Sequence, residues 1–133
     1  MQKSSHSNEL SSSSYSSTER RNQRRKWVIR TGCLLAAGTV TMGALGGHKY
    51  EWSARTTSLY HTAINYSFFN SVGVILSAFI TESLVPPGLF IGGILGFSVP
   101  IWLKAFTQSR ALYMLLPFGG VMLILGWVAA AFL

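Results

Sequence analysis

Acidic residues are scarce in this chain of 133 residues, which has four Asp and Glu against eleven Lys and Arg. Only 11% of its residues are charged, whereas about a quarter are charged in an average soluble domain. From Thr62 to the end, three charged residues remain: Glu82, Lys104 and Arg110. One domain's length with so few charges argues against a soluble protein. The chain divides instead into a polar basic tail and a membrane-embedded body.

Cysteine is equally scarce, since Cys33 is the single one and no internal disulfide can form. It gives no information about the compartment. Because it lies in an apolar segment, and a free thiol packs like a small hydrophobic group, we expect Cys33 to be buried and inert.

Groups for catalysis are missing from the apolar segments. No Ser/His/Asp set is readable, no paired carboxylates lie within a run, and no Gly-rich phosphate loop follows a strand pattern. His48 and His61 flank the first loop, but a zinc site usually needs three or four ligands, and no carboxylate or cysteine cluster accompanies them. We therefore predict no enzymatic activity, no catalytic residues, no metal and no cofactor.

What the sequence does contain begins with a Ser-rich, basic segment at residues 1–26. Besides Met1, its one aliphatic side chain is Leu10, which is too little apolar surface to offset the entropy of ordering, so the segment predicts disorder. The basic residues that can fix topology and touch anionic lipid headgroups are Arg20, Arg21, Arg24, Arg25 and Lys26. A mitochondrial transit peptide and a phosphorylated tail are alternatives. Nucleic acid is not expected, because the cluster abuts a membrane helix.

Four apolar runs follow, at residues 27–47, 62–81, 87–106 and 111–132. Each has the roughly 20 residues that a helix needs to cross about 30 Å of hydrocarbon. The sequence therefore predicts an all-α integral membrane bundle of four transmembrane helices over residues 27–133. Residues 48–61 are expected to form a polar loop with interfacial aromatics, and Pro86 and Pro87 to separate two helices. A cleavable signal peptide is the alternative interpretation of the first run.

Four spans place both termini on one side of the membrane. The side that holds the N-terminus, the turn at 82–86 and the C-terminus carries seven Lys and Arg, and the other side carries four. The positive-inside rule then predicts that both termini face the cytosol or its equivalent. Plasma, secretory and mitochondrial inner membranes all fit this sequence.

Small and polar residues form a stripe on the second run, spaced three and four apart as on one helix face: Ala63, Tyr66, Asn70, Gly73 and Ser77. In lipid, helices associate through close packing of small residues and through interhelical hydrogen bonds, so we expect this stripe to face protein. The side expected to face lipid carries Phe68, Phe69, Val72, Ile75, Leu76 and Phe79. Two roles stay open for Tyr66 and Asn70: interhelical hydrogen bonding, or a polar site or proton path.

Small residues also mark a face on each of the other runs. The first run has Gly32, Ala36, Thr39, Gly43 and Gly46, followed by Gly47 and His48. The third has Gly88, Gly92 and Gly96, and the fourth has Gly119 and Gly120 after Pro117. Such faces allow close approach of two backbones, and we predict that they hold a compact bundle together.

Four segments occur in a suggestive order and spacing: MGALGGHKY, TAINYSFFNSVGVIL, FSVPIWLKAF and LPFGGVMLILGW. Over residues 38–128 the chain resembles the small membrane-protein family called domain of unknown function 423, which includes transmembrane protein 256-like chains. The positions that match the family pattern are His48, Tyr66, Phe97, Ser98, Pro117, Gly119, Gly120, Gly126 and Trp127.

The chain departs from the family pattern at two places. Asn70 stands where the pattern has histidine, and Val99 and Pro100 replace a Gly-Ser pair. The resemblance implies a multi-pass helical membrane protein without an established activity, and it argues against cleavage after the first run. A proton or metal role of that histidine in relatives would be lost here.

Two functions compete on these observations. The leading hypothesis is a non-enzymatic membrane protein that acts in packing or assembly, or by binding a membrane-protein partner, because glycine faces are abundant and catalytic groups are missing. The alternative is an oligomeric small transporter or channel subunit, based on Tyr66 and Asn70. One bundle of this size has little room for a pore, so the alternative requires a homo-oligomer.

Overall fold

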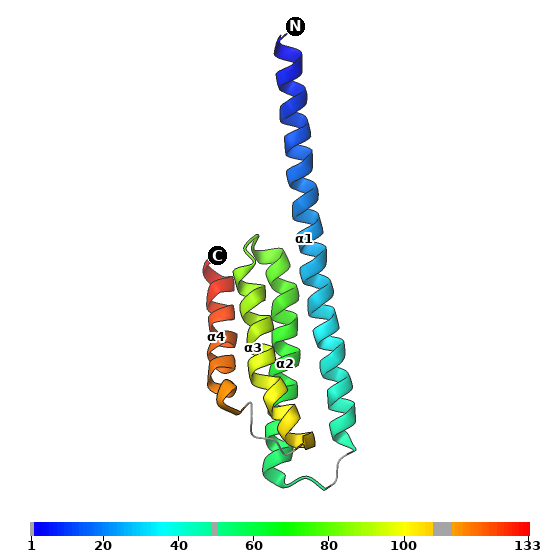
Figure 1. Ribbon diagram of the computed structural model, residues 1–133, viewed down its shortest axis with the longest axis vertical. Helices are drawn as coiled ribbons and strands as arrows, with labels where there is room; N and C mark the ends of the chain where they lie inside the picture. Colours follow the sequence, from blue (N-terminus) through cyan, green and yellow to red (C-terminus); the bar gives the residue numbers. More distant parts are fainter. Residues whose placement is uncertain (1, 49–50, 108–112) are drawn as a thin grey trace.

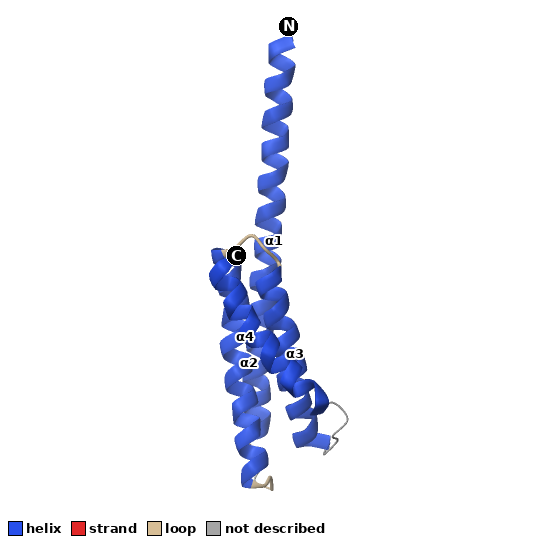
Figure 2. Cartoon of the chain, turned by 90° about the vertical axis from the view of Figure 1, so that its left-hand side faces the viewer, coloured by secondary structure: helices blue, strands red, loops and turns tan. Residues whose placement is uncertain are grey.

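The computed structural model describes residues 2–48, 51–107 and 113–133, with side chains from Ser14 onward. Its elements, in order, are the helices α1 (Gln2–Gly47), α2 (Ala54–Ile80) and α3 (Val85–Thr107), the 3-10 turn η1 (Tyr113–Leu115), and helix α4 (Leu116–Phe132). Figure 2 shows the short turn, residues 81–84, that joins α2 to α3. Within these described ranges, four helices are long and apolar enough to cross a membrane, which confirms the all-α, four-span architecture.

The helices pack in a row, with α1 against α2, α2 against α3, and α3 against α4 (Figure 1). α2 and α4 touch only briefly, so α2 and α3 are the interior members of the row. In the most apolar stretch of α1, 11% of the residues are buried, against 39% in α2 and in α3. α1 is therefore the most open of the four helices.

The N-terminal segment differs from the expected disorder, because α1 begins at Gln2 and continues without a break through residue 26 into the first span. A helix of 46 residues is about 69 Å long, more than twice the hydrocarbon thickness. Its first half projects beyond the bundle at the end where the C-terminus lies (Figure 1). Once a transmembrane helix is formed, each further residue adds one hydrogen bond without a new nucleus, and Glu, Arg, Gln and Lys are good helix formers. Lack of apolar surface alone favours disorder here, whereas propagation from the membrane span extends the helix.

The loop expected at residues 48–61 is shorter than predicted. α2 begins at Ala54, where the Ser53 side chain accepts a hydrogen bond from the backbone N–H of Thr56 at 3.3 Å and caps the helix. Residues 49–50 lie outside the described residues. The polar stretch after Ser53 is thus a helical extension of the second span, because capping and propagation outweigh its polarity.

Prolines open two of the helices. Pro86 and Pro87 lie in the first turn of α3, as predicted, where a missing backbone N–H costs nothing. Pro117 lies in the first turn of α4, which becomes a regular helix only at Leu116. It therefore starts that helix, whereas the sequence placed it inside the fourth span. The beginning of that predicted span, residues 111–112, lies outside the described residues.

Candidate functional site

The stripe predicted on α2 is buried at four of its five positions, where the exposed fractions are 0% for Ala63, 2% for Asn70 and 1% for Ser77, and Gly73 is buried too. Tyr66 is the exception, since 53% of it is exposed. Its ring lies 5.6 Å from the Phe97 ring, centroid to centroid, at the edge of the α2–α3 contact. The prediction that Tyr66 faces protein is therefore wrong, because the residue lies at the rim of this contact and more than half of its surface is uncovered.

A second buried face on α2 was missed by the sequence reasoning. Ser67, Ser71 and Val74 are all buried, and they lie on the side that meets α1. The hydroxyls of Thr39 and Ser67 are 2.9 Å apart and hydrogen-bonded across this contact. Ile75, assigned to lipid from the sequence, packs beside Gly32 of α1. The spacing of four between Ser67 and Ser71 could have indicated this second face. An interior helix of the row packs against a neighbour on each side, so it buries two faces.

Asn70 uses both ends of its amide, one within α2 and the other to join α2 to α4. Its Nδ2 donates to the backbone oxygen of Tyr66 at 2.7 Å, and its Oδ1 accepts from Nε1 of Trp127 at 3.0 Å. The Trp127 ring in turn meets the Phe90 ring edge-on, with centroids 5.0 Å apart. Phe90 is fully buried and packs in the core with Val74. In the described structure, the amide thus forms a structural cross-link between helices.

Other buried hydroxyls bond to the backbone rather than to one another. Ser98 of α3 donates to the Ala63 oxygen of α2 at 3.2 Å, and Ser77 donates to the Val74 oxygen at 2.6 Å. Among the described residues, Nε1 of Trp102 is the one buried side-chain nitrogen or oxygen that has no hydrogen-bond partner. Polar groups in the apolar interior are costly unless paired. The Ser77 bond satisfies its hydroxyl within α2, and the Ser98 bond links α3 to α2.

The contact between α3 and α4 is formed by glycines on both helices. A Cβ added at Gly119 would lie 2.5 Å from the carbonyl carbon of Gly96, and closer still to the Phe97 backbone nitrogen. Two backbones therefore touch here. Gly92 lies against Met122, and Gly120 keeps ordinary contact with Phe97, whose Cδ2 would lie 3.9 Å from an added Cβ.

Two further glycines were not predicted as packing positions. Gly93 of α3 lies beside Leu123, and Gly126 of α4 faces the Phe90 ring. Gly73 of α2 also approaches that ring, with 3.0 Å between an added Cβ and Phe90 Cζ. The aromatic ring thus fills a slot that small residues on two helices leave open. A spacing of four on α3 selects Gly88, Gly92 and Gly96, and it therefore leaves out the adjacent Gly93.

On α1, several of the predicted small residues do contact α2. Gly43 lies near Ile64, with 3.7 Å between an added Cβ and Cγ2, and Gly46 lies against the ring of Tyr60. Tyr60 is buried and its hydroxyl donates to the backbone oxygen of Met42. Tyr60 thus joins α2 to α1 by packing and by a hydrogen bond, at the end of the bundle opposite the chain termini.

Three residues of the predicted faces, and the predicted burial of Cys33, differ from the structure. Open space surrounds both Gly47 and Gly88, so neither is in a helix contact. His48 is exposed in the turn after α1. Cys33 is exposed as well, because only one side of α1 meets another helix, and the residues on its remaining sides have no neighbour to bury them.

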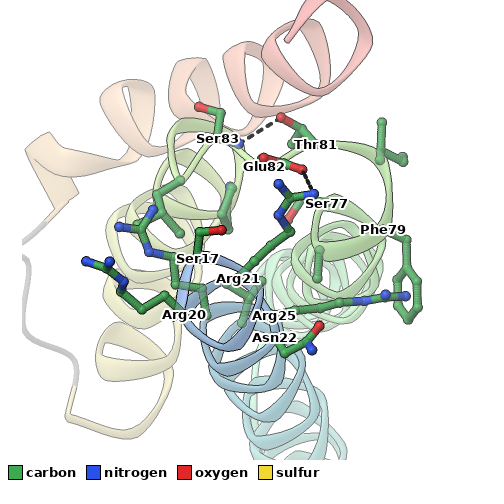
Figure 3. Close-up of a pocket in the computed structure, with 16 residues that line it drawn as sticks. Ser17, Arg20, Arg21, Asn22, Arg25, Ser77, Phe79, Thr81, Glu82 and Ser83 are labelled. Carbon is green, nitrogen blue, oxygen red and sulfur yellow. Dashed lines mark hydrogen bonds and ion pairs between the residues drawn. The ribbon is translucent and has the colours of Figure 1, made fainter. Parts of the chain in front are cut away.

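A pocket of about 590 Å³ lies between the projecting part of α1 and the turn from α2 to α3 (Figure 3). Its arginines are Arg20, Arg21, Arg24 and Arg25. Arg21 Nη1 lies 2.8 Å from Oε1 of Glu82, and the Arg25 guanidinium lies 4.2 Å from the centroid of the Phe79 ring. Lys26 does not line the pocket.

Ligand sets for metals are not gathered in the described residues, where no group of three or more His, Cys, Asp and Glu side chains lies together. The chemistry that the arrangement does provide is of two kinds. Small and polar residues fasten helices to one another, and arginines face a cavity at one end of the bundle.

Four apolar helices fastened by glycine contacts and buried hydrogen bonds define a multi-pass helical membrane protein. The family described as protein of unknown function (DUF423) matches residues 42–120, and the chain belongs to this family. The UPF0382 membrane protein YwdK of Bacillus subtilis is 29% identical over 112 residues, which cover 77% of this chain and 91% of that protein.

Other relatives carry the same description. A UPF0382 membrane protein of Staphylococcus saprophyticus is 31% identical over 110 residues, covering 77% of this chain and 92% of the relative. A UPF0382 membrane protein of Haemophilus influenzae is 27% identical over 100 residues, which cover 70% of this chain and 81% of that relative. No solved structure matches the chain. The first 41 residues, which include the projecting half of α1, lie outside the matched family region.

Proposed function

We propose that this protein is a non-enzymatic membrane protein that binds another membrane protein through the open side of α1. The observation that carries the proposal is the one-sided packing of α1, which makes extensive contact with α2 alone among the described helices. The buried polar groups of α2 and α3 support it, because Asn70, Ser67 and Ser98 bond within the chain.

The open side of α1 combines bulky and small residues. Leu34, Val40 and Leu45 are 73%, 60% and 53% exposed, and nothing lies within 4 Å of a Cβ added at Gly38. Small residues allow another helix to approach closely in lipid, where association depends on packing and not on the hydrophobic effect. A partner helix can therefore pack here as α2 packs on the opposite side.

The proposal is tested by placing a photo-crosslinking residue at Leu34 and, as a control, at Ile124, which is 65% exposed on α4. We expect an adduct of defined mass with a different membrane protein from Leu34 and none from Ile124. An adduct of two copies of this chain would favour the alternative, an oligomeric transporter or channel subunit. Equal labelling of lipid alone at both sites would overturn the proposal.

We further propose that both termini lie on the cytosolic or equivalent inner side and that the basic segment touches anionic headgroups there. α1 leaves the bundle at the end where the C-terminus lies (Figure 1), and most of the Lys and Arg are near it. In a Cys33→Ser background, an impermeant thiol reagent added outside intact cells should label a cysteine at Ser53. Labelling of a cysteine at Ser11 from outside would contradict this topology.

A further inference from the structure

We propose that the pocket between α1 and the α2–α3 turn binds the phosphate headgroup of one anionic phospholipid, with the acyl chains continuing along the lipid-exposed ends of α1 and α2. This inference rests on, and deepens, the proposed contact between the basic segment and headgroups. The general contact needs only a positive surface, whereas a pocket requires particular side chains in particular places.

The charge of the pocket selects the ligand class. Four arginines and Glu82 line it, so four positive charges less one negative charge leave an excess of three. Arg21 pairs with Glu82, and no ion pair with the other three arginines is found among the described residues. Guanidinium groups bind phosphate through planar, bidentate hydrogen bonds. An anion with several acceptor oxygens therefore fits this lining better than a neutral or cationic group.

The ion pair between Arg21 and Glu82 does not block such a ligand. The two side chains are 64% and 70% exposed, and exposed pairs contribute little because water screens them. A phosphate entering the pocket can take over the donors of Arg21 and release Glu82 to solvent. The Arg25 guanidinium lies over the Phe79 ring and has no ion pair among the described residues, so it can offer N–H donors to a phosphate.

The apolar part of the lining points to a lipid instead of a soluble phosphate. Val28, Ala78, Phe79, Ile80, Leu84 and Pro87 share the pocket with the arginines. Phe79 and Ile80 are 58% and 59% exposed, so this surface opens sideways from the bundle. Its volume, about 590 Å³, suits a headgroup and the start of its chains, since ligand sites commonly measure about 300–1,000 Å³.

The position along the bundle agrees with the membrane boundary. The pocket lies where α2 ends and α3 begins, as Figure 3 shows with Arg21 reaching Glu82 and Arg25 reaching Phe79. Trp27 is 61% exposed on the same stretch of α1, and tryptophan is enriched at the level of headgroups. A phosphate at this height needs no burial of its charge in hydrocarbon.

The experiment uses the full chain in mixed micelles that contain equal amounts of phosphatidylglycerol and phosphatidylcholine, with bound lipid counted by native mass spectrometry. We expect one phosphatidylglycerol to be retained in preference to phosphatidylcholine. Arg21→Gln or Arg25→Gln should lower its apparent affinity on the order of tenfold, as expected for a lost charge-assisted hydrogen bond. Lys26→Gln, the matched control with the same charge change, should alter it less than about twofold.

Two variants that each remove a glutamate test independently whether lipid retention can also be raised. Glu82→Gln should raise retention about twofold to fivefold, because a competing carboxylate is removed. Glu19→Gln should leave it unchanged, because Glu19 of α1 does not line the pocket. If Arg21→Gln and Glu82→Gln both lowered retention, Arg21 would serve only its ion pair and the lipid site would be refuted. Unchanged thermal melting of each variant shows that folding is not the cause.

Two further comparisons distinguish a lipid headgroup from soluble phosphate, and the specific pocket from the general contact with headgroups. Inorganic phosphate should displace the lipid no better than chloride at equal ionic strength, and stronger displacement would make this a soluble-phosphate site. Equal losses from Arg21→Gln and Lys26→Gln, with anionic vesicles still preferred over phosphatidylcholine vesicles, would overturn the pocket and leave the general headgroup contact standing. Loss of that vesicle preference in the unsubstituted protein would overturn both.

Discussion

The α3–α4 contact and the α1–α2 contact both depend on glycine, but different groups oppose the glycines. On α4, Gly119 faces the backbone of Gly96 and Phe97. On α1, Gly46 faces the side chain of Tyr60, whereas Gly32 faces the Ile75 side chain with the Ser71 backbone oxygen 3.1 Å from an added Cβ. A backbone cannot move without its helix, whereas a side chain can change rotamer. Glycine therefore fixes α3 rigidly against α4 at Gly119, whereas the α1–α2 contact at Gly46 has room to adjust.

The first test of this difference is the substitution Gly119→Ala. The added methyl would overlap the backbone of α3, so the helices must separate, and we expect a loss of about 3 kcal/mol in the free energy of unfolding, the upper end for overpacking. Gly120→Ala is the matched control, because its Cβ would lie 3.9 Å from Phe97, and alanine favours helix. The measurement is unfolding in a titration of denaturing detergent. Equal stability of the two variants would contradict a backbone contact.

The second test is Gly73→Leu on α2, where Phe90 is the opposing group at 3.0 Å. Phe90 is fully buried and held by its neighbours, so we expect a loss of about 2 kcal/mol. Val72→Leu, at an adjacent and more exposed residue, should have little effect in lipid. Protease resistance in one detergent compares the two. If Val72→Leu were as harmful, the assignment of the inner and outer sides of α2 would be wrong.

The third test moves to α1 with Gly46→Ala and its neighbour Gly47→Ala. A Cβ at Gly46 would lie 2.6 Å from Cζ of Tyr60, whereas nothing lies near Gly47. Because a side chain opposes Gly46, partial rearrangement limits the expected loss to about 1 kcal/mol. Thermal aggregation of the two purified variants measures it. An effect of Gly46→Ala as large as that of Gly119→Ala would remove the proposed difference between backbone and side-chain contacts.

The smallest effect is expected from the hydrogen bond between Thr39 and Ser67. A double-mutant cycle with Thr39→Val and Ser67→Ala should give a coupling of about 0.6 kcal/mol, the average for such bonds in membranes. The cycle is measured by the same detergent titration. A coupling close to zero would mean that the α1–α2 contact relies on shape alone.

Much of the fold was predictable because lipid simplifies the rules. Four apolar runs of sufficient length specify four spans, since the backbone must satisfy its own hydrogen bonds in hydrocarbon. The sequence also indicated which faces of α2, α3 and α4 pack, as Asn70, Gly96 and Gly119 illustrate. It misplaced Tyr66, Gly88 and Cys33, because spacing gives the direction of a side chain but not the neighbour that covers it.

The sequence by itself determined the class of protein, the number of spans and the presence of small-residue faces. Only the tertiary structure decided that the helices form a row, that α2 buries two faces, and that Trp127 pairs with Asn70 from 57 residues away. It also brought Glu82 to Arg21 and so formed the pocket. Hydrophobic period and length are local properties of a chain, whereas the order in which helices pack depends on contacts that no local pattern records.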